Sequence, residues 1–140
     1  MVTAAKAATV ERRIYKRFET DLPVIVQADS GDRLECRAMN VSLAGMEVRT
    51  DRYTVTQVCP KGEKTTPDQS PVVRMQLDLP TTDGSTRSII VDCRILIVRR
   101  VSQEDYHLHI QYEFFQGNGY DELEEYVDAK LAMLPDAGEE

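Results

Sequence analysis

LPVIVQADSGDRLECRAMNV, residues 22–41, places two alternating apolar and polar runs on either side of a turn. The run DSGD, residues 29–32, supplies the residues that favour a tight turn. On one face of the first run fall Leu22, Val24, Val26 and Ala28. Side chains of a strand point alternately to its two faces, so this pattern predicts an antiparallel hairpin with one buried face.

The same period of two recurs along the chain. After SLAG comes MEVRT, and a further alternating run covers residues 73–79. One face of the next run carries Ile89, Val91, Cys93, Ile95 and Ile97. One face of the last carries Tyr106, Leu108, Ile110, Tyr112 and Phe114. Six strands in antiparallel succession predict a closed or nearly closed β-barrel, because closure removes exposed strand edges.

The period changes to 3.6 residues after QGNG, residues 116–119. The apolar stripe that follows consists of Tyr120, Leu123, Val127, Leu131 and Leu134, and Pro135 marks its end. We expect one amphipathic helix over residues 119–134, whose stripe covers one opening of the barrel. Pairing of this helix between subunits is the alternative interpretation. The fold class is therefore all-β with a C-terminal helix.

The chain is predicted to form a single domain, since 140 residues can bury one core but not two of ordinary size. The proline-rich segment Cys59–Pro71 is expected to be a loop, either a lid or partner surface or a mobile insertion. The predicted parts are a flexible tail (1–10), a domain (11–135) made of a basic arm (11–18), a barrel (21–115) and the helix (119–134), and an acidic tail (136–140).

The charge of the chain is unevenly distributed. The formal net charge is -7, but residues 120–140 hold eight acids and one lysine, so the remainder is balanced. Residues 1–20 carry a local surplus of three positive charges. The acidic remainder would repel duplex DNA, and no apolar run is long enough for membrane insertion. We expect a cytoplasmic protein.

Little in the sequence supports metal or catalytic chemistry. Cys36, Cys59 and Cys93 are odd in number and lack any CxxC pairing, so we expect reduced thiols. His107 and His109 share a strand face, but no partner ligand stands at a suitable spacing, so we expect neither a metal site nor a cofactor. Catalytic motifs such as GxSxG, HExxH and GxxxxGK do not occur, and we expect no enzymatic activity.

Two short motifs carry the functional prediction. The first is ERRIYKR, residues 11–17, which contains Arg12, Arg13 and Arg17. Guanidinium groups match phosphate oxygens and the O6/N7 edge of guanine, and their flat faces stack on bases. The alternative is a solubilising basic turn beside the acidic helix.

The second motif is NVSLAG, residues 40–45. Asn40 and Ser42 stand at alternate positions, so they would project from one strand face, where an amide and a hydroxyl can bind a polar ligand. Gly45 permits a positive φ or the close approach of a ligand to the backbone. The alternative is a plain strand-turn-strand corner.

Together the two motifs resemble the PilZ family, bacterial receptors for cyclic di-GMP. ERRIYKR resembles the family's RxxxR arm and NVSLAG its [DN]xSxxG strand, with 22 residues between Arg17 and Asn40. The resemblance covers most of the chain and implies a six-stranded PilZ-type barrel. The ligand-binding residues that it implies are Arg12, Arg13, Arg17, Asn40, Ser42 and Gly45.

The resemblance also implies roles for these residues and for the protein. Arg13 and Arg17 would grip guanine edges and phosphates, while Arg12 stacks on or flanks a base. The chain departs from the family pattern at His109, where a small residue is common, and in its long loop. We expect a cyclic di-GMP receptor, monomeric or weakly dimeric, whose ordered arm signals to an unidentified effector protein. The alternative is a ligand-independent PilZ-like adaptor that docks onto a partner.

Overall fold

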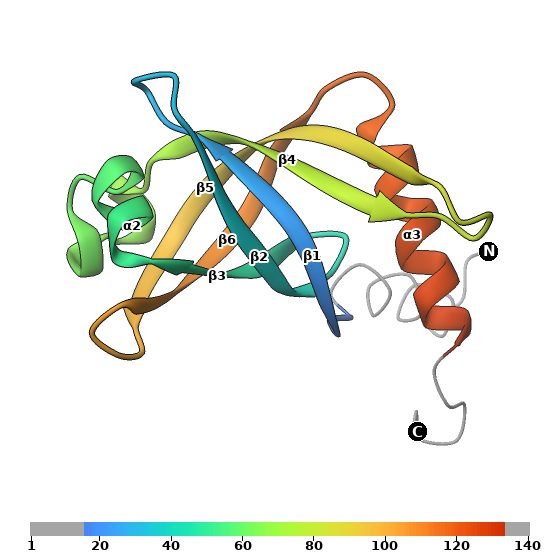
Figure 1. Ribbon diagram of the computed structural model, residues 1–140, viewed down its shortest axis with the longest axis horizontal. Helices are drawn as coiled ribbons and strands as arrows, with labels where there is room; N and C mark the ends of the chain where they lie inside the picture. The colour runs from blue at the N-terminus through green and yellow to red at the C-terminus, as the bar shows by residue number, and fades with distance from the viewer. Residues whose placement is uncertain (1–15, 134–140) are drawn as a thin grey trace, which may run out of the picture.

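The computed structural model describes residues 16–133, which form a closed antiparallel β-barrel with a helix near each end (Figure 1). The predicted six-stranded barrel with a C-terminal helix is confirmed. The strands are β1 (Phe18–Gln27), β2 (Arg33–Val41), β3 (Gly45–Asp51), β4 (Val72–Pro80), β5 (Thr86–Arg100) and β6 (Asp105–Phe115).

Two three-stranded meanders, β1–β2–β3 and β4–β5–β6, make up the barrel. Pairing of β3 with β6 and of β1 with β4 joins the meanders and closes the sheet. The inward positions of the predicted hairpin are buried as expected, and they meet side chains from both meanders. The largest fully buried side chains include Met46, Met75, Leu77, Ile95 and Leu108. Removal of this apolar surface from water is the main force that holds the barrel together.

Two residues predicted to face the core point outward instead. Ile97 is 46% exposed and Phe114 is 61% exposed. The β5–β6 register shifts between Ile95 and Ile97, and again between Asp92 and Cys93. An irregularity that adds one residue to a strand moves every later side chain to the other face, and strict alternation cannot foresee it.

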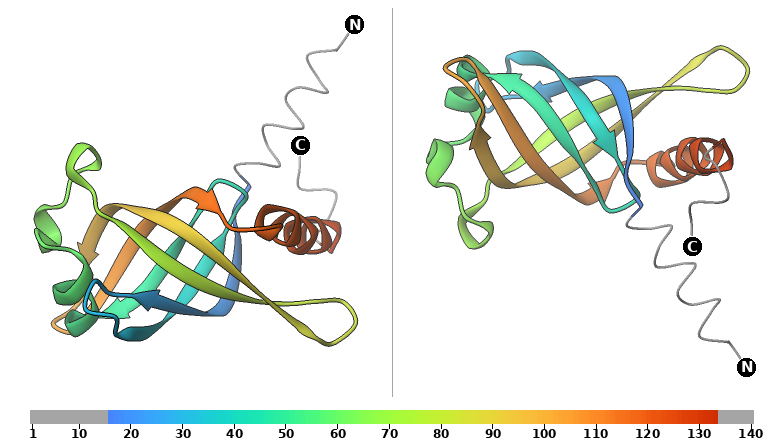
Figure 2. Two further views of the ribbon diagram at one scale, coloured as in Figure 1. Left: turned by 90° about the horizontal axis from the view of Figure 1, so that it is seen from above. Right: turned by 90° about the horizontal axis from the view of Figure 1, so that it is seen from below.

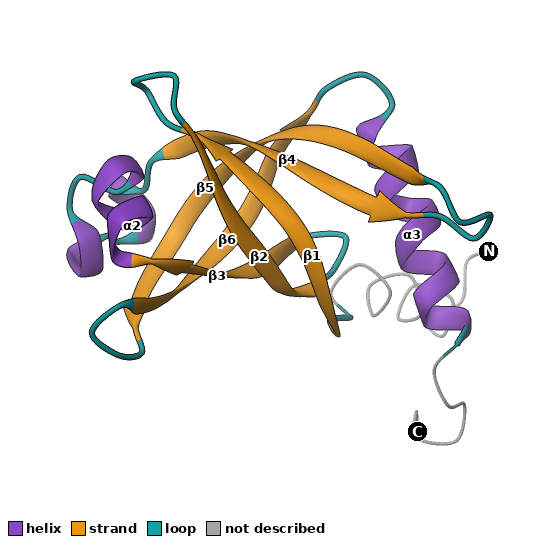
Figure 3. Ribbon diagram, in the orientation of Figure 1, coloured by secondary structure: helices purple, strands orange, loops and turns teal. Residues whose placement is uncertain are grey.

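A helix that the sequence analysis missed lies at one end of the barrel. It is α2 (Arg52–Val58), and Asp51 caps its start by accepting a hydrogen bond from the Thr54 amide at 2.9 Å. Val55 and Val58 bury their side chains against the barrel. The segment predicted as a loop, Cys59–Pro71, contains two short 3-10 helices, η1 (Gly62–Lys64) and η2 (Pro67–Gln69). These pieces gather beside α2 at the same end of the barrel (Figure 3).

The helix α3 (Gly119–Ala132) lies across the opposite end, as predicted (Figure 2). Its buried side chains include Leu123, Tyr126 and Val127, whereas Tyr120 is 38% exposed. Tyr126, which is not part of the predicted stripe, is therefore buried, while Tyr120, the first member of the stripe, is partly exposed and packs against Phe115. Leu134, the last member of that stripe, lies outside the described residues.

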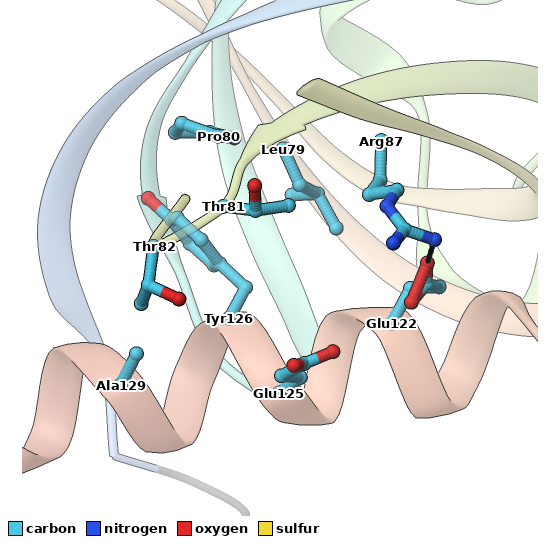
Figure 4. Close-up of a pocket in the computed structure, with 9 residues that line it drawn as sticks. All are labelled: Leu79, Pro80, Thr81, Thr82, Arg87, Glu122, Glu125, Tyr126 and Ala129. Carbon is cyan, nitrogen blue, oxygen red and sulfur yellow. Dashed lines mark hydrogen bonds and ion pairs between the residues drawn. The ribbon is translucent and has the colours of Figure 1, made fainter. Parts of the chain in front are cut away.

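Side-chain contacts fix α3 to two strands. The Tyr126 hydroxyl lies 2.7 Å from the Thr20 hydroxyl on β1, and its ring lies 6.0 Å from the ring of Phe18. On the other side Arg87 of β5 forms an ion pair with Glu122 at 3.1 Å, which is visible in Figure 4. The cavity between α3 and the β4–β5 hairpin measures only about 30 Å³. No helix within residues 16–133 is long and apolar enough to cross a membrane.

Candidate functional site

A row of paired residues crosses the outer surface of the barrel from β2 to β5. Asn40 of β2 pairs with Glu47 of β3, Glu47 pairs with His109 of β6, and His109 pairs with Ile97 of β5. We call these four residues the outer row. Neighbouring strands lie about 4.8 Å apart, so three strand spacings give the row a span of roughly 14 Å.

Asn40 reaches the outer surface because β2 is irregular. Cys36 and Ala38 point into the core, and strict alternation would send Asn40 inward as well. The β2–β3 register shifts between Ala38 and Asn40, so Asn40 faces outward and Val41 is fully buried. The bulge therefore decides which residue of the motif is presented at the surface.

Glu47 is the centre of a polar cluster on this surface. Its Oε1 accepts a hydrogen bond from Asn40 Nδ2 at 2.9 Å, and its Oε2 lies 3.2 Å from His109 Nε2. The same Oε2 lies 3.8 Å from both His107 Nδ1 and Arg99 Nη2. The Glu47 side chain is only 15% exposed. We call these five residues the Glu47 cluster.

The surroundings of Glu47 hold it in the ionised form. Burial alone would raise its pKa, because it disfavours the charged carboxylate. The hydrogen bond from Asn40 and the charges of His109, His107 and Arg99 outweigh that penalty, and the pKa of Glu47 lies below its usual value. The cluster therefore contains one negative charge that Asn40 hydrogen-bonds and that His109 and Arg99 approach, while His107 Nδ1 accepts a hydrogen bond from Arg99 Nη2 at 3.0 Å.

Arg17 joins the basic arm to this cluster. Its Nη1 donates a hydrogen bond to Asn40 Oδ1 at 2.9 Å. The two predicted motifs, 23 positions apart in the chain, thus meet side chain to side chain. Arg17 also lines an open recess of about 450 Å³ together with Lys16 and with Lys130 of α3. Three cationic side chains and one carboxylate, Glu19, line this recess, so its surplus of positive charge attracts anions.

Ser42 and Gly45 serve the local structure. Ser42 is 2% exposed, so it does not share the outer face with Asn40. Its Oγ accepts from the amides of Ala44 and Gly45 at 3.1 Å each and donates to the Gly45 carbonyl at 3.2 Å. Gly45 does not have a positive φ. A Cβ there would lie 2.1 Å from the Ile110 carbonyl oxygen, so glycine is required by the close approach of β6.

The remaining predicted site residues, Arg12 and Arg13, lie outside the described residues. The structure adds four residues to the candidate site that the sequence did not predict there: Glu47, Arg99, Ile97 and Lys130. Pairing of β3, β6 and β5 brings Glu47, Arg99 and Ile97 together. The residue pattern of one strand does not predict which residues of a neighbouring strand will pair with it.

The histidines and cysteines are accounted for by their surroundings. His107 and His109 face Glu47, and residues 16–133 contain no group of three or more His, Cys, Asp or Glu arranged to hold a metal ion. All three cysteines are free and buried. Burial raises the pKa of Cys36 and Cys59 to about 12, so both remain protonated thiols at neutral pH.

Comparison with known proteins decides the family. The sequence pattern of the PilZ domain matches residues 11–129, which include both motifs and all six strands. The chain belongs to the PilZ family. No curated protein sequence matches this PilZ domain.

Solved structures share the PilZ fold at low sequence identity. The Bacillus subtilis inhibitor of motility MotI/DgrA superposes with a TM-score of 0.60 at 15% identity, over 83% of this chain and 49% of that chain. Borreliella burgdorferi PlzA in complex with c-di-GMP superposes with a TM-score of 0.55 at 8% sequence identity, over 95% of this chain and 58% of that chain. MrkH, a c-di-GMP-dependent transcription regulatory factor, superposes with a TM-score of 0.53 at 15% sequence identity, over 83% of this chain and 48% of that chain. This PilZ domain thus spans about half the length of the solved proteins it matches.

Proposed function

We propose that this PilZ domain is a receptor for cyclic di-GMP, which binds across the outer row while the arm, residues 11–18, folds over it. The observation that carries the proposal is the hydrogen bond between Arg17 and Asn40, because it brings the RxxxR and NxSxxG motifs together on one surface. Membership of the PilZ family and the fold shared with PlzA, solved with c-di-GMP, support the same ligand.

The chemistry of the surface suits a ligand with two guanines and two phosphates. Arg17, with Arg12 and Arg13 from the arm, supplies guanidinium groups for phosphates and for the O6/N7 edge of guanine. Asn40 contributes its amide oxygen at the barrel wall, where it accepts a hydrogen bond from Arg17. Ser42 and Gly45 shape the turn that follows Asn40, and this is the role we propose for them in ligand binding.

The far end of the outer row can accommodate a base. His109 is a flat ring, and Ile97 is 46% exposed beside it. A purine that packs over these two side chains would bury apolar surface that otherwise faces water. His109 thus offers a stacking surface where other members of the family often carry a small residue.

We further propose that binding leads to signalling through protein contact and not to catalysis. The recess that Arg17 shares with Lys130 of α3 offers a route, because a phosphate held there would connect the arm to the helix. An effector protein in the bacterial cytoplasm would then recognise the ordered arm or the altered surface of α3. In this proposal residues 11–135 act as one domain between a tail at 1–10 and an acidic tail at 136–140.

Isothermal titration with cyclic di-GMP tests the receptor proposal. Arg17→Ala and Arg13→Ala should each weaken binding by at least roughly tenfold, since a hydrogen bond to a charged group contributes about 1.5–3 kcal/mol. Arg33→Ala is the matched control, because Arg33 lies on β2 about 23 Å from Asn40 and donates to Gln76. A wild-type protein that gives no binding heat would refute the proposal.

A capture experiment separates the receptor from the ligand-independent adaptor. The immobilised protein is incubated with extract of its host, with and without cyclic di-GMP. The receptor proposal expects a partner whose retention changes with the nucleotide and no longer changes in Arg17→Ala. A partner retained equally under all conditions would favour the adaptor.

A further inference from the structure

We propose that Glu47 is a positioning residue that requires an amide, and not a carboxylate, at position 40. The inference rests on the proposed function, because the amide in question is the one that meets the arm and the ligand. Its basis is the pair of hydrogen bonds that Asn40 makes in opposite senses: Nδ2 donates to Glu47 and Oδ1 accepts from Arg17.

The two bonds fix the orientation of the Asn40 amide. Glu47 is an acceptor when ionised and Arg17 is only a donor, so only one of the two amide orientations satisfies both neighbours. The carbonyl oxygen of Asn40 therefore faces the arm and its NH₂ group faces β3. Without Glu47, the Nδ2 group of Asn40 would lose the acceptor that fixes its orientation.

The rest of the Glu47 cluster keeps the carboxylate in position. His109, His107 and Arg99 all approach Oε2, whereas Asn40 approaches Oε1. With its side chain only 15% exposed, Glu47 is held by its neighbours. Oε1 thus points along the outer row toward β2, where it meets the motif residue.

An aspartate at position 40 would be incompatible with this arrangement. It would place a carboxylate oxygen where an amide nitrogen now lies 2.9 Å from Glu47 Oε1. Two carboxylates at that separation repel each other unless one binds a proton or moves away. The PilZ motif accepts Asp or Asn at this position, and in this chain the neighbouring Glu47 determines which of them fits.

A swap of the two side chains tests the inference. The dissociation constant for cyclic di-GMP is measured by titration at pH 7.5 for wild type, Asn40→Asp, Glu47→Gln and the double variant. Asn40→Asp should weaken binding at least tenfold. The double variant should return to within about threefold of wild type, because the new amide at position 47 then donates to the new carboxylate at position 40. That carboxylate still accepts from Arg17.

The control variant is Glu35→Gln, which removes the same charge from an exposed position of β2 about 17 Å from Asn40. It should leave the affinity unchanged. An Asn40→Asp variant that binds as tightly as wild type, or a double variant no better than Asn40→Asp, would overturn the inference.

Melting of the ligand-free proteins separates this inference from the receptor proposal. The melting temperature should fall in Asn40→Asp and recover in the double variant, because the repulsion exists without ligand. If wild type binds no cyclic di-GMP, the receptor proposal fails, and recovery of the melting temperature still supports the amide requirement. Failure of the melting temperature to recover overturns that requirement whether or not the ligand binds.

Discussion

The outer surface around the Arg74–Asp92 pair of β4 and β5 differs from the one around the Glu47 cluster. On the first, Arg74 of β4 pairs with Asp92 of β5 at 3.0 Å, and both side chains are substantially exposed. One cation meets one anion, so the pair leaves little local charge. Exposed pairs of this kind contribute little to stability and offer nothing in particular to a ligand.

On the second surface the charges do not match one to one. The single carboxylate of Glu47 faces Arg99 and two histidines, while Arg17 approaches through Asn40. The Glu47 carboxylate is only 15% exposed and contacts several partners, whereas Asp92 pairs with Arg74. The two surfaces differ in how many neighbouring side chains contact the carboxylate. This difference, and not the number of charges, distinguishes the candidate ligand site from an ordinary polar strand surface.

The largest effect should come from Gly45, on which the second surface depends. A Cβ at position 45 would stand 2.1 Å from the Ile110 carbonyl oxygen, so Gly45→Ala must push β3 away from β6. We expect a loss of about 3 kcal/mol or more in the free energy of unfolding, measured with denaturant. Gly119→Ala is the control, since its Cβ would meet only ordinary contacts at 3.5 Å. Equal stability of Gly45→Ala and wild type would contradict the observed strand spacing.

The next effect tests whether the ligand extends along the outer row as far as Ile97 of β5. Ile97→Asn should weaken cyclic di-GMP binding by roughly fivefold, the equivalent of about 1 kcal/mol of lost apolar contact. Val101→Asn removes an equally exposed apolar side chain outside the row and should have no effect. If the two variants titrate alike, the ligand does not extend to β5.

A smaller effect should appear in the pH dependence of stability. The pKa of Glu47 is lowered in the folded state from 4.5, so its contribution is present above pH 4.5 and is lost as the pH falls through the folded value. Glu47→Gln should therefore lose part of the acid destabilisation seen in wild type below pH 4.5. Unfolding curves at a series of pH values measure this, and parallel profiles for the two proteins would show that the cluster does not hold the carboxylate ionised.

The smallest effect is expected on the paired surface. Asp92→Asn should change the free energy of unfolding by less than about 1 kcal/mol, because its ion pair with Arg74 is exposed. Its dissociation constant for cyclic di-GMP should equal that of wild type. A weakened affinity in this variant would mean that the surface around the Arg74–Asp92 pair also takes part in binding, and the contrast between the two surfaces would be lost.

The two helices show what local sequence can and cannot predict. The bounds of α3 are predicted to within two residues, because a long apolar stripe specifies a helix, whereas its buried face includes Tyr126 and not the predicted Tyr120. The seven residues of α2 are too few for such a stripe to stand out. Its one local signal, Asp51 as N-cap, is weak by itself because aspartate is also common in turns.

The amino-acid sequence by itself determined the barrel, the helix α3 and the two motifs, because alternation, helical spacing and motif spacing are all properties of neighbouring residues. Only the tertiary structure decided which side chains share a surface. Bulges turned Asn40 and Ile97 outward, and Ser42 hydrogen-bonds within the turn that follows β2. Pairing of β3 with β6 then brought Glu47 beside His109. Such contacts depend on register between strands far apart in the chain, and no local pattern encodes that register.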